Sequence, residues 1–178
     1  MKASTVLLLS LSACSLDVRP ELSYASEAPA AGGEPEAVVF LEPVDDRRPD
    51  GEVVGRVGSA PRVRYLVAED TATAWVVEAL REELGRAGVR AIPRDASEGW
   101  VLRAWLGGLR YQVMPFQIRG LIVLELELLK DGRRVFRKIY ARPGESNAGS
   151  CAETLNGALR LALLHAVPEI LAAIRSAT

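Results

Sequence analysis

The sequence has very little histidine and cysteine, which removes several classes of catalytic and metal site. Its 178 residues include one histidine, His165, and two cysteines, Cys14 and Cys151. A single imidazole excludes sites built from several histidines and weakens every Ser-His or Cys-His catalytic scheme. The cysteines and the histidine also lack the spacing of a zinc site. His165 falls on the flank of a helical pattern, so we interpret it as a surface residue. We expect no metal.

The common nucleophile and nucleotide motifs are also missing. There is no G-x-S-x-G turn, no Walker A loop, and no G-x-G-x-x-G motif that follows a strand and opens a helix. Asp45, Asp46 and Asp50 lack the spacing and the closing Glu of a calcium loop. The sequence therefore predicts no enzyme and no cofactor other than a covalently bound lipid.

Long blocks of one charge and long apolar runs are absent as well. The formal net charge is −1, with no block of basic residues, so we expect no nucleic-acid partner. No apolar run reaches the ~18–20 residues needed to span a bilayer. Hydrophobic residues make up 49% and charged residues 25%, which is typical of one globular domain with a sizeable core.

The N-terminus carries the clearest functional pattern. Lys2 is followed by the short apolar run Ala3 to Leu11, by small residues at Ser12 and Ala13, and by Cys14. This order is that of a secretory signal, and Leu11-Ser12-Ala13-Cys14 resembles a bacterial lipobox. The resemblance implies that residues 1–13 are removed and that Cys14 carries a lipid. Ser15, rather than Asp, follows that cysteine, which implies sorting to the outer membrane, on its periplasmic face.

Residues 15–36 are rich in Ala, Pro, Glu, Ser and Gly and have no sustained apolar period. With Cys14, they are predicted to form a lipidated, flexible tether over residues 14–36, about 25 Å in average span. Residues 37–176 would then form a single periplasmic domain. Because a lipid on Cys14 would leave Cys151 without a disulfide partner, Cys151 is either a buried small hydrophobe or a free thiol.

The sequence of the domain predicts, in order, short strands, a helix, long strands and a last helix. Strands are expected at 37–41, 53–58, 63–67, 100–113 and 116–130, the last followed by a hairpin turn at Asp131-Gly132. We expect a β-bulge at Gly107-Gly108, where the apolar parity switches, and a loop at 142–149. This order predicts an α+β two-layer sandwich, with a mostly antiparallel sheet and two helices packed on one face.

The two helices are expected at 71–87 and 151–174, the second kinked or divided at Pro168. Trp75 lies off the apolar stripe of the first helix, so it is either covered by a neighbouring loop or exposed for a partner. Leu161 and Leu164 lie off the stripe of the second helix. They would pack on the tether, on a second subunit or on a partner.

The hairpin turn sets a register that places Leu128 opposite Val135, Leu124 opposite Ile139 and Glu125 opposite Lys138. The same register places Arg137 opposite Leu126, on the apolar face. Arg137 is then either an edge residue whose charge reaches solvent or a buried functional charge.

The loop after the first strand carries a further resemblance. Val39-Phe40-Leu41 is followed by Asp46-Arg47-Arg48 and then by Val54-Gly55. This resembles the YajG-type family of uncharacterised bacterial lipoproteins, which have an Asp-x-Arg loop and a hydrophobic-Gly pair. The resemblance implies location and fold and brings no catalytic residues. The Asp-x-Arg match is Asp46-Arg47-Arg48, or Asp45-Asp46-Arg47 in the other register. We interpret this Asp-Arg loop, with Asp46 and Arg47 as its charges of interest, as a local ion pair that closes a turn, in preference to a functional site.

These patterns favour an outer-membrane lipoprotein that serves as a non-enzymatic envelope assembly or interaction module, with an envelope protein as partner. The alternative is a lipoprotein similar to LptE or to transporter-auxiliary lipoproteins, which would bind lipid or lipopolysaccharide in an apolar groove near Leu161 and Leu164. A less favoured alternative is a periplasmic glycan hydrolase, with Asp45 or Asp46 paired with Glu125 or Glu127.

Overall fold

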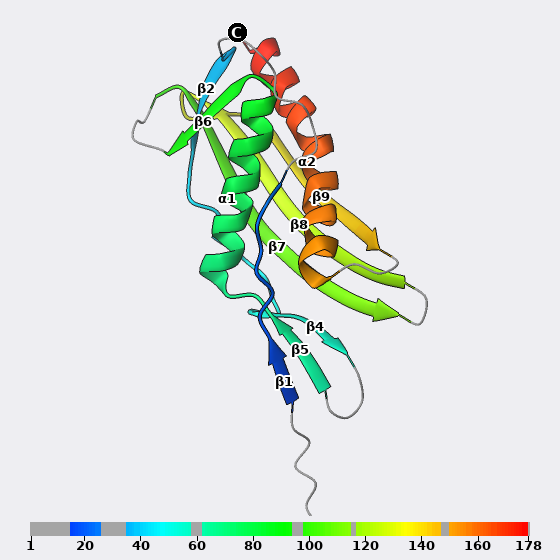
Figure 1. The fold of residues 1–178 in the computed structure, drawn as a ribbon. Coiled ribbons are helices and arrows are strands. Elements are labelled where there is room, and N and C mark those ends of the chain that lie inside the picture. Colours follow the sequence, from blue (N-terminus) through cyan, green and yellow to red (C-terminus); the bar gives the residue numbers. More distant parts are fainter. Residues whose placement is uncertain are drawn as a thin grey trace, which may run out of the picture.

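A computed structural model describes residues 15–25, 35–57, 62–93, 98–114, 117–146 and 150–177. Within these ranges the chain forms a large mixed sheet, a small sheet and two long helices (Figure 1). The α+β class predicted from the sequence is confirmed. The signal-peptide residues, Cys14 and residues 26–34 lie outside the described residues.

The large sheet is antiparallel on one side and parallel on the other. Its strands lie in the order β6 (Val89–Pro93), β2 (Ala37–Leu41), β7 (Trp100–Met114), β8 (Gln117–Lys130) and β9 (Arg133–Ser146), with β3 (Asp45–Asp46) also paired to β7. The long strands β7, β8 and β9 pair antiparallel, whereas β2 runs parallel to both β6 and β7. Strand β6 follows the first helix directly and was not predicted.

Both helices lie on the same face of this sheet, as expected (Figure 1). Helix α1 spans Glu69–Arg86 and helix α2 spans Cys151–Ser176. A capping box opens α2, in which Ser150 and Glu153 satisfy each other's backbone N–H groups. The helix is long and apolar enough to cross a membrane by length and composition, but its apolar residues pack on the sheet.

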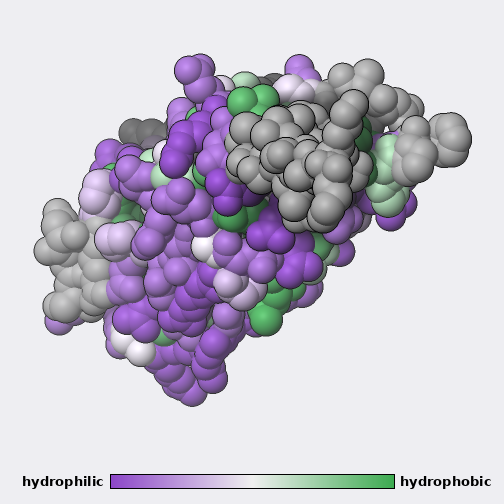
Figure 2. All heavy atoms as spheres, turned by 90° about the horizontal axis from the view of Figure 1, so that it is seen from below, coloured by the Kyte–Doolittle hydropathy of each residue, from purple (hydrophilic) through white to green (hydrophobic). Residues whose placement is uncertain are grey.

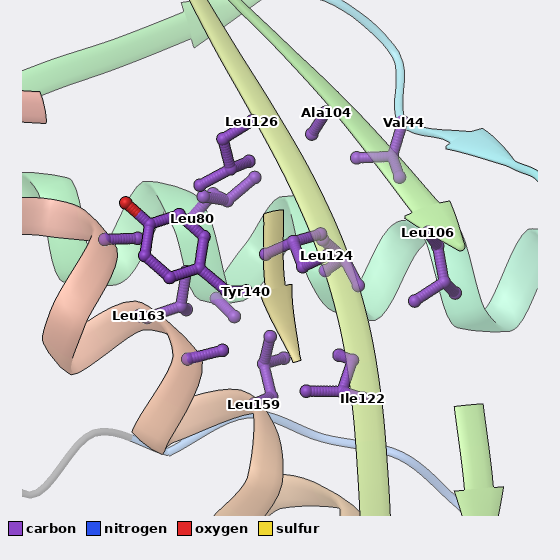
Figure 3. Close-up of a cluster of buried hydrophobic side chains, with 14 of the residues drawn as sticks. Val44, Leu80, Ala104, Leu106, Ile122, Leu124, Leu126, Tyr140, Leu159 and Leu163 are labelled. Atoms are coloured by element: carbon purple, nitrogen blue, oxygen red, sulfur yellow. The ribbon is translucent and has the colours of Figure 1, made fainter. Parts of the chain in front are cut away.

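The core lies between the helices and the sheet. Figure 3 shows Leu124 and Leu126 of β8 and Tyr140 of β9 meeting Leu80 of α1 and Leu163 of α2. All five side chains are at most 2% exposed. The division predicted at Pro168 is wrong, because α2 runs unbroken through it. Buried packing on both sides of the proline offsets the hydrogen bond that it removes.

The predicted bulge in β7 is confirmed. The pairing with β8 shifts between Leu106 and Gly108, which leaves Gly107 as the extra residue. A ladder with one inserted residue changes its apolar parity without changing its face. The bulge therefore keeps Leu106 and Leu109, both at most 2% exposed, on the buried side of the strand.

The register predicted for the next hairpin is wrong by one residue. Asp131 and Gly132 do form the turn, both with positive φ, as a two-residue hairpin requires. A second bulge follows at once, because Leu129 pairs with Arg134 and Leu128 with Phe136, which leaves Val135 unpaired. Every later residue of β9 therefore faces the side opposite to the one predicted.

Two segments expected to lack regular structure form strands instead. Strand β9 continues through the predicted loop to Ser146. Residues 15–25 are not a tether: β1 (Ser15–Val18) joins β5 (Arg62–Leu66) and β4 (Val53–Val57) in the small sheet, in the order β1-β5-β4. Tyr24 is buried, and its hydroxyl donates a hydrogen bond of 2.7 Å to Glu83. The folded domain therefore includes residues that the composition had assigned to a linker.

Candidate functional site: the uncovered sheet face

The Asp-Arg loop forms two ion pairs with different environments. Asp45 binds Arg47 at 2.7 Å, and both side chains are about half exposed (53% each). Asp46 binds Arg48 at 2.6 Å, and these side chains are only 5% and 2% exposed. Strand β3 runs parallel to β7 and sends alternate residues to opposite sides, so one pair faces solvent and the other is buried. The local ion pair expected in this loop is therefore present in both registers of the Asp-x-Arg pattern, as Asp45 with Arg47 and as Asp46 with Arg48.

The buried pair also ties the loop to the short segment between β5 and α1. The Arg48 guanidinium donates to the backbone carbonyl of Val67 at 3.1 Å, and Asp46 accepts hydrogen bonds from the backbone and the side chain of Arg48. A buried charge needs such partners, because its transfer from water is costly. The role of this pair is to hold the loop against the sheet.

Arg47 and Arg137 come together on the ring of Trp105. The Arg47 guanidinium carbon lies 4.9 Å from the ring centroid and that of Arg137 lies 5.7 Å from it. Arg137 also donates to Glu125 at 2.6 Å. Cation–π contact and an ion pair therefore fix both arginines over one indole. The prediction that Arg137 faces Leu126 is wrong, because the bulge at Val135 turns it to the other side, opposite Glu127.

These residues lie on the face of the sheet that neither helix covers. We call Arg47, Trp105, Glu125, Arg137 and Ile139 the Trp105 face. Ile139 of the edge strand β9 pairs with Glu125 across the strands and is 59% exposed, a large aliphatic side chain left open to solvent. The Trp105 face thus combines an aromatic ring, two arginines and an exposed aliphatic side chain.

A ladder of charges continues beside the Trp105 face. Arg103 binds Glu42 at 2.8 Å and Glu127 at 3.5 Å, and Arg134 binds Glu127 at 3.5 Å from the other side. Glu127 itself is only 7% exposed. The ladder holds charges of both signs in fixed positions and gives this side of the sheet a defined electrostatic pattern.

Trp105 was not singled out from the sequence, although a signal for it is present. The apolar residues of β7 before the bulge fall at even positions from Trp100 to Leu106, and Trp105 has the opposite parity. A tryptophan on the polar side of an amphipathic strand is a feature that a pattern search could use. Its neighbours Arg47 and Arg137 could not be brought to it without the register.

Trp75 is not available to a partner. It is 2% exposed, and its indole N–H donates to the side-chain oxygen of Asn156 in α2 at 2.7 Å. The amide nitrogen of Asn156 in turn donates to the backbone carbonyl of Ser23 at 2.8 Å. The side of α1 that carries Trp75 is thus covered by α2. The interpretation of Trp75 as an exposed partner-binding residue is wrong.

Leu161 and Leu164 lie on the outer side of α2, with exposed fractions of 39% and 64%. The apolar groove predicted near these two leucines, between α2 and the sheet, is not present. The side chains of Leu159 and Leu163 occupy that space and are fully buried. Leu161 and Leu164 therefore form an exposed apolar spot and not the wall of a cavity.

Hollows are formed by other parts of the described chain, and one of about 370 Å³ lies along β9 at Arg134, Val135, Phe136 and Arg137. Another of about 490 Å³ lies between β4 and β7 and is lined by Arg56, Arg110 and Tyr111 among others. A third of about 640 Å³ lies on the outer side of α1, beside Pro43 and Val44. A further one of about 210 Å³ lies at the β7 bulge. None of these is lined by both Asp46 and Glu125.

Cys151 is buried, which agrees with its interpretation as a small hydrophobic residue of the core. Burial raises the pKa of its thiol to about 12. Among the described residues, no group of three or more His, Cys, Asp or Glu side chains is placed to hold a metal ion.

No family model and no curated protein matches this chain. Among solved structures it is similar to XCC0632 from Xanthomonas campestris, a DUF330 protein, with a TM-score of 0.58 and 13% identity over 90% of this chain and 97% of that one. It is also similar to lipoprotein GNA1162 from Neisseria meningitidis, with a TM-score of 0.47 and 12% identity over 76% and 98% of the two chains. The likeness to XCC0632 shows a shared fold. The YajG-type assignment stays a prediction.

Proposed function

We propose that this chain is a lipid-anchored protein of the bacterial outer membrane, facing the periplasm, whose domain is a non-enzymatic interaction module. The lipobox ending at Cys14 and the Ser15 that follows it support the location. The fold that this chain shares with XCC0632, a DUF330 protein, is compatible with it.

The observation that carries the interaction role is Trp105 between Arg47 and Arg137 on an uncovered sheet face. Tryptophan and arginine are enriched among the residues that dominate binding energy at protein interfaces. Here the two arginines are already held in place by Asp45 and Glu125. A partner that binds this surface would lose little side-chain entropy on this side of the interface. We infer that the partner is an envelope protein.

The anchor is tested by the substitution Cys14→Ser. Without the cysteine sulfur no lipid can be attached, so the protein should move from the membrane fraction to the soluble fraction of cells. Globomycin, which blocks lipoprotein processing, should leave the precursor uncleaved. Unchanged membrane partitioning of Cys14→Ser, with normal expression, would contradict a lipid anchor.

The interaction surface is tested by crosslinking in cells. A photoreactive residue at Ile139 should capture one envelope protein reproducibly, and the additional substitution Trp105→Ala should abolish that capture. The matched control is the same photoreactive residue at Leu164, which is as exposed as Ile139 (64% against 59%) but lies on α2. Capture from Leu164 and not from Ile139 would move the interface to α2 and defeat the role of the Trp105 face.

The second candidate function is that of a transporter-auxiliary lipoprotein that binds lipid or lipopolysaccharide. The exposed Leu161 and Leu164 favour it, although they line no groove between α2 and the sheet. Native mass spectrometry of the protein after gentle extraction should then show a bound lipid that is lost in Leu164→Ser. A glycan hydrolase is disfavoured, because Asp46 is buried against Arg48 and Glu125 is bound to Arg137.

A further inference from the structure

The small sheet begins directly at the proposed lipid anchor. Strand β1 starts at Ser15, the residue after Cys14, and Ser15 pairs with Arg62 of β5. Consecutive Cα atoms are about 3.8 Å apart. A lipid on Cys14 would therefore hold this end of the sheet at the membrane, without the span of about 25 Å that a coil over residues 15–36 would have given.

The end of the molecule that would face the membrane is therefore defined. In Figure 1 the small sheet lies at one end, with β1, β5 and β4 side by side, and the C-terminal end of α2 lies at the other. Three neighbouring strands span about 10 Å. The residues within two or three positions of Ser15 on these strands form what we call the β1 end: Leu16, Asp17, Arg56, Val57, Val63 and Arg64.

One face of the β1 end is apolar. Leu16 pairs with Val63, and Val63 pairs with Val57, so the three side chains share a face. Leu16 is 60% exposed, although the strand offers it an aliphatic neighbour. An exposed leucine next to a lipid anchor is placed to enter the headgroup region, where each buried CH₂ contributes about 0.8 kcal/mol.

The other face of the β1 end carries an uncompensated positive charge. Asp17, Arg64 and Arg56 form one row across the three strands. Asp17 binds Arg64 through two hydrogen bonds of 2.8 Å, which lowers the pKa of Asp17. Arg56 is exposed and makes no ion pair or hydrogen bond in the described part of the chain. Arg56 lies directly opposite Arg64 on the paired strand, and like charges in this position repel each other. An anion beside Arg56 would reduce this repulsion.

The surroundings of Arg56 suit a phosphate group. Arg56 lines the hollow of about 490 Å³ between β4 and β7, together with Arg110. Arg110 is paired with Asp50 at 3.3 Å, so Arg56 is the cation there without a carboxylate partner among the described residues. Guanidinium groups bind phosphate oxygens in a planar, bidentate manner. Figure 2 views the molecule from below, and the residues that it leaves uncovered are mainly hydrophilic, with small apolar patches.

We propose that the β1 end lies on the membrane surface as a phospholipid-binding surface, with Leu16 among the headgroups and Arg56 on lipid phosphates. This proposal rests on the proposed lipid anchor at Cys14. It adds an orientation: the small sheet faces the bilayer and the far end of α2 faces the periplasm.

The orientation is tested with the full lipidated protein in vesicles of phosphatidylcholine and phosphatidylglycerol. A fluorophore on Leu16→Cys should be quenched several-fold more strongly by headgroup-labelled quencher lipids than one on Leu164→Cys. Cys14 carries its lipid through sulfur and Cys151 is buried, so neither takes up the label. Equal quenching at the two positions, in protein that floats with the vesicles, would overturn the orientation and leave the anchor intact. Protein that does not float would instead overturn the proposed function.

The role of Arg56 is tested by Arg56→Gln, with Arg133→Gln as the matched control. Arg133 is also exposed and unpaired among the described residues, but it lies beside the β8–β9 turn, far from the β1 end. Arg56→Gln should reduce the quenching at Leu16 when phosphatidylglycerol is present, and Arg133→Gln should leave it unchanged. An equal effect of the two substitutions would show that Arg56 binds no lipid phosphate. Neither change is expected to unfold the protein, because both side chains are exposed.

Discussion

At the scale of single residues, Asp45 and Asp46 show how far two neighbours can differ. Both bind the arginine two positions later, with nearly equal distances. Only the second pair is buried, so only there does the loss of one partner leave an uncompensated charge away from water. Burial, and not distance, decides what each ion pair contributes.

We therefore predict that Asp46→Ala lowers the free energy of unfolding by about 3–5 kcal/mol, because Arg48 stays buried without its carboxylate. Asp45→Ala should change it by less than about 1 kcal/mol, because Arg47 is half exposed. Urea unfolding followed by tryptophan fluorescence measures both. Equal effects of the two substitutions would show that the burial of Arg48 has no energetic consequence.

The thiol of Cys151 gives a prediction about pH. Its pKa is about 12 in the folded chain, raised by burial from an ordinary 9.0. A raised pKa contributes stability that is complete below pH 9 and is lost as the pH rises toward 12. Burial also raises the pKa of Tyr24 and Tyr140, which act in the same direction. The protein should therefore become less stable above pH 9.

The measurement is the urea midpoint at a series of pH values from neutral to strongly alkaline. Cys151→Ala removes one titrating group and should flatten the decline, without abolishing it, because the tyrosines remain. The native thiol should also react with a maleimide far more slowly at neutral pH than the same thiol in urea. Fast labelling of the native protein would contradict the burial.

The residues of the Asp-Arg loop and their ion pairs could be predicted from the sequence, but the burial of each pair could not. The Asp-x-Arg spacing indicated a local ion pair in either register, but only the strand character of Asp45–Asp46 places the two carboxylates on opposite sides, one exposed and one buried. Arg137 was named as a charge of interest for the wrong reason, since its contact with Trp105 depends on a bulge 2 residues earlier. The sequence identified the charged residues, but their burial and their long-range contacts could be known only from the structure.

At the scale of elements, the two bulges show which irregularities a sequence reveals. Gly107-Gly108 marks the first, because glycine tolerates the kink and the apolar parity changes there. The second falls at Val135, a residue typical of regular strands, directly after the turn. The helices and long strands were predictable from periodicity, whereas the register of β9 and the existence of β6 depend on tertiary pairing.

The packing of α2 on the sheet depends on glycines in two strands. A Cβ added at Gly144 would lie 2.5 Å from the backbone nitrogen of Ala158 and 2.6 Å from the carbonyl of Thr154. Gly120 in β8 is in a similar position, 2.8 Å from the same carbonyl. These contacts are with backbone atoms, which cannot rotate away. The first half of α2 therefore rests directly on the main chain of the sheet.

We predict that Gly144→Ala destabilises the protein by about 1–3 kcal/mol, because α2 must move outward. The control is Gly85→Ala in α1, where an added Cβ meets nothing within 4 Å. That change should stabilise the protein by about 0.5–1 kcal/mol through helix propensity. Thermal unfolding by circular dichroism measures both. A neutral Gly144→Ala would show that the helix is not held at this distance.

At the scale of the whole molecule, residues 15–25 are part of the fold. The Ala-, Pro- and Ser-rich composition of residues 15–36 predicted a linker, because composition reports the average character of a segment and not single contacts. Tyr24 reaches Glu83 of α1, and the carbonyl of Ser23 reaches Asn156 of α2. A few long-range bonds of this kind fix a segment that has no apolar period.

This attachment predicts that distance from the membrane matters. Ten Gly and Ser residues inserted between Cys14 and Ser15 would add about 17 Å of flexible span. Lipidation and stability should be unchanged, whereas a label at Leu16 should lose its quenching by headgroup lipids. Flotation and urea unfolding provide the controls. Undiminished quenching in the extended protein would show that the β1 end finds the membrane without the short connection.

The bond between Ser23 and Asn156 also has a consequence for the order of assembly. These residues are 133 positions apart, and the ion pair of Glu36 with Arg175 spans 139. A ribosome releases the N-terminal residues first, so Ser23 and Glu36 can make these contacts only after the last helix has been synthesised. Such long-range closure is slow compared with local folding. The N-terminal residues of the domain therefore reach their final contacts only when α2 has packed on the sheet, at the end of folding.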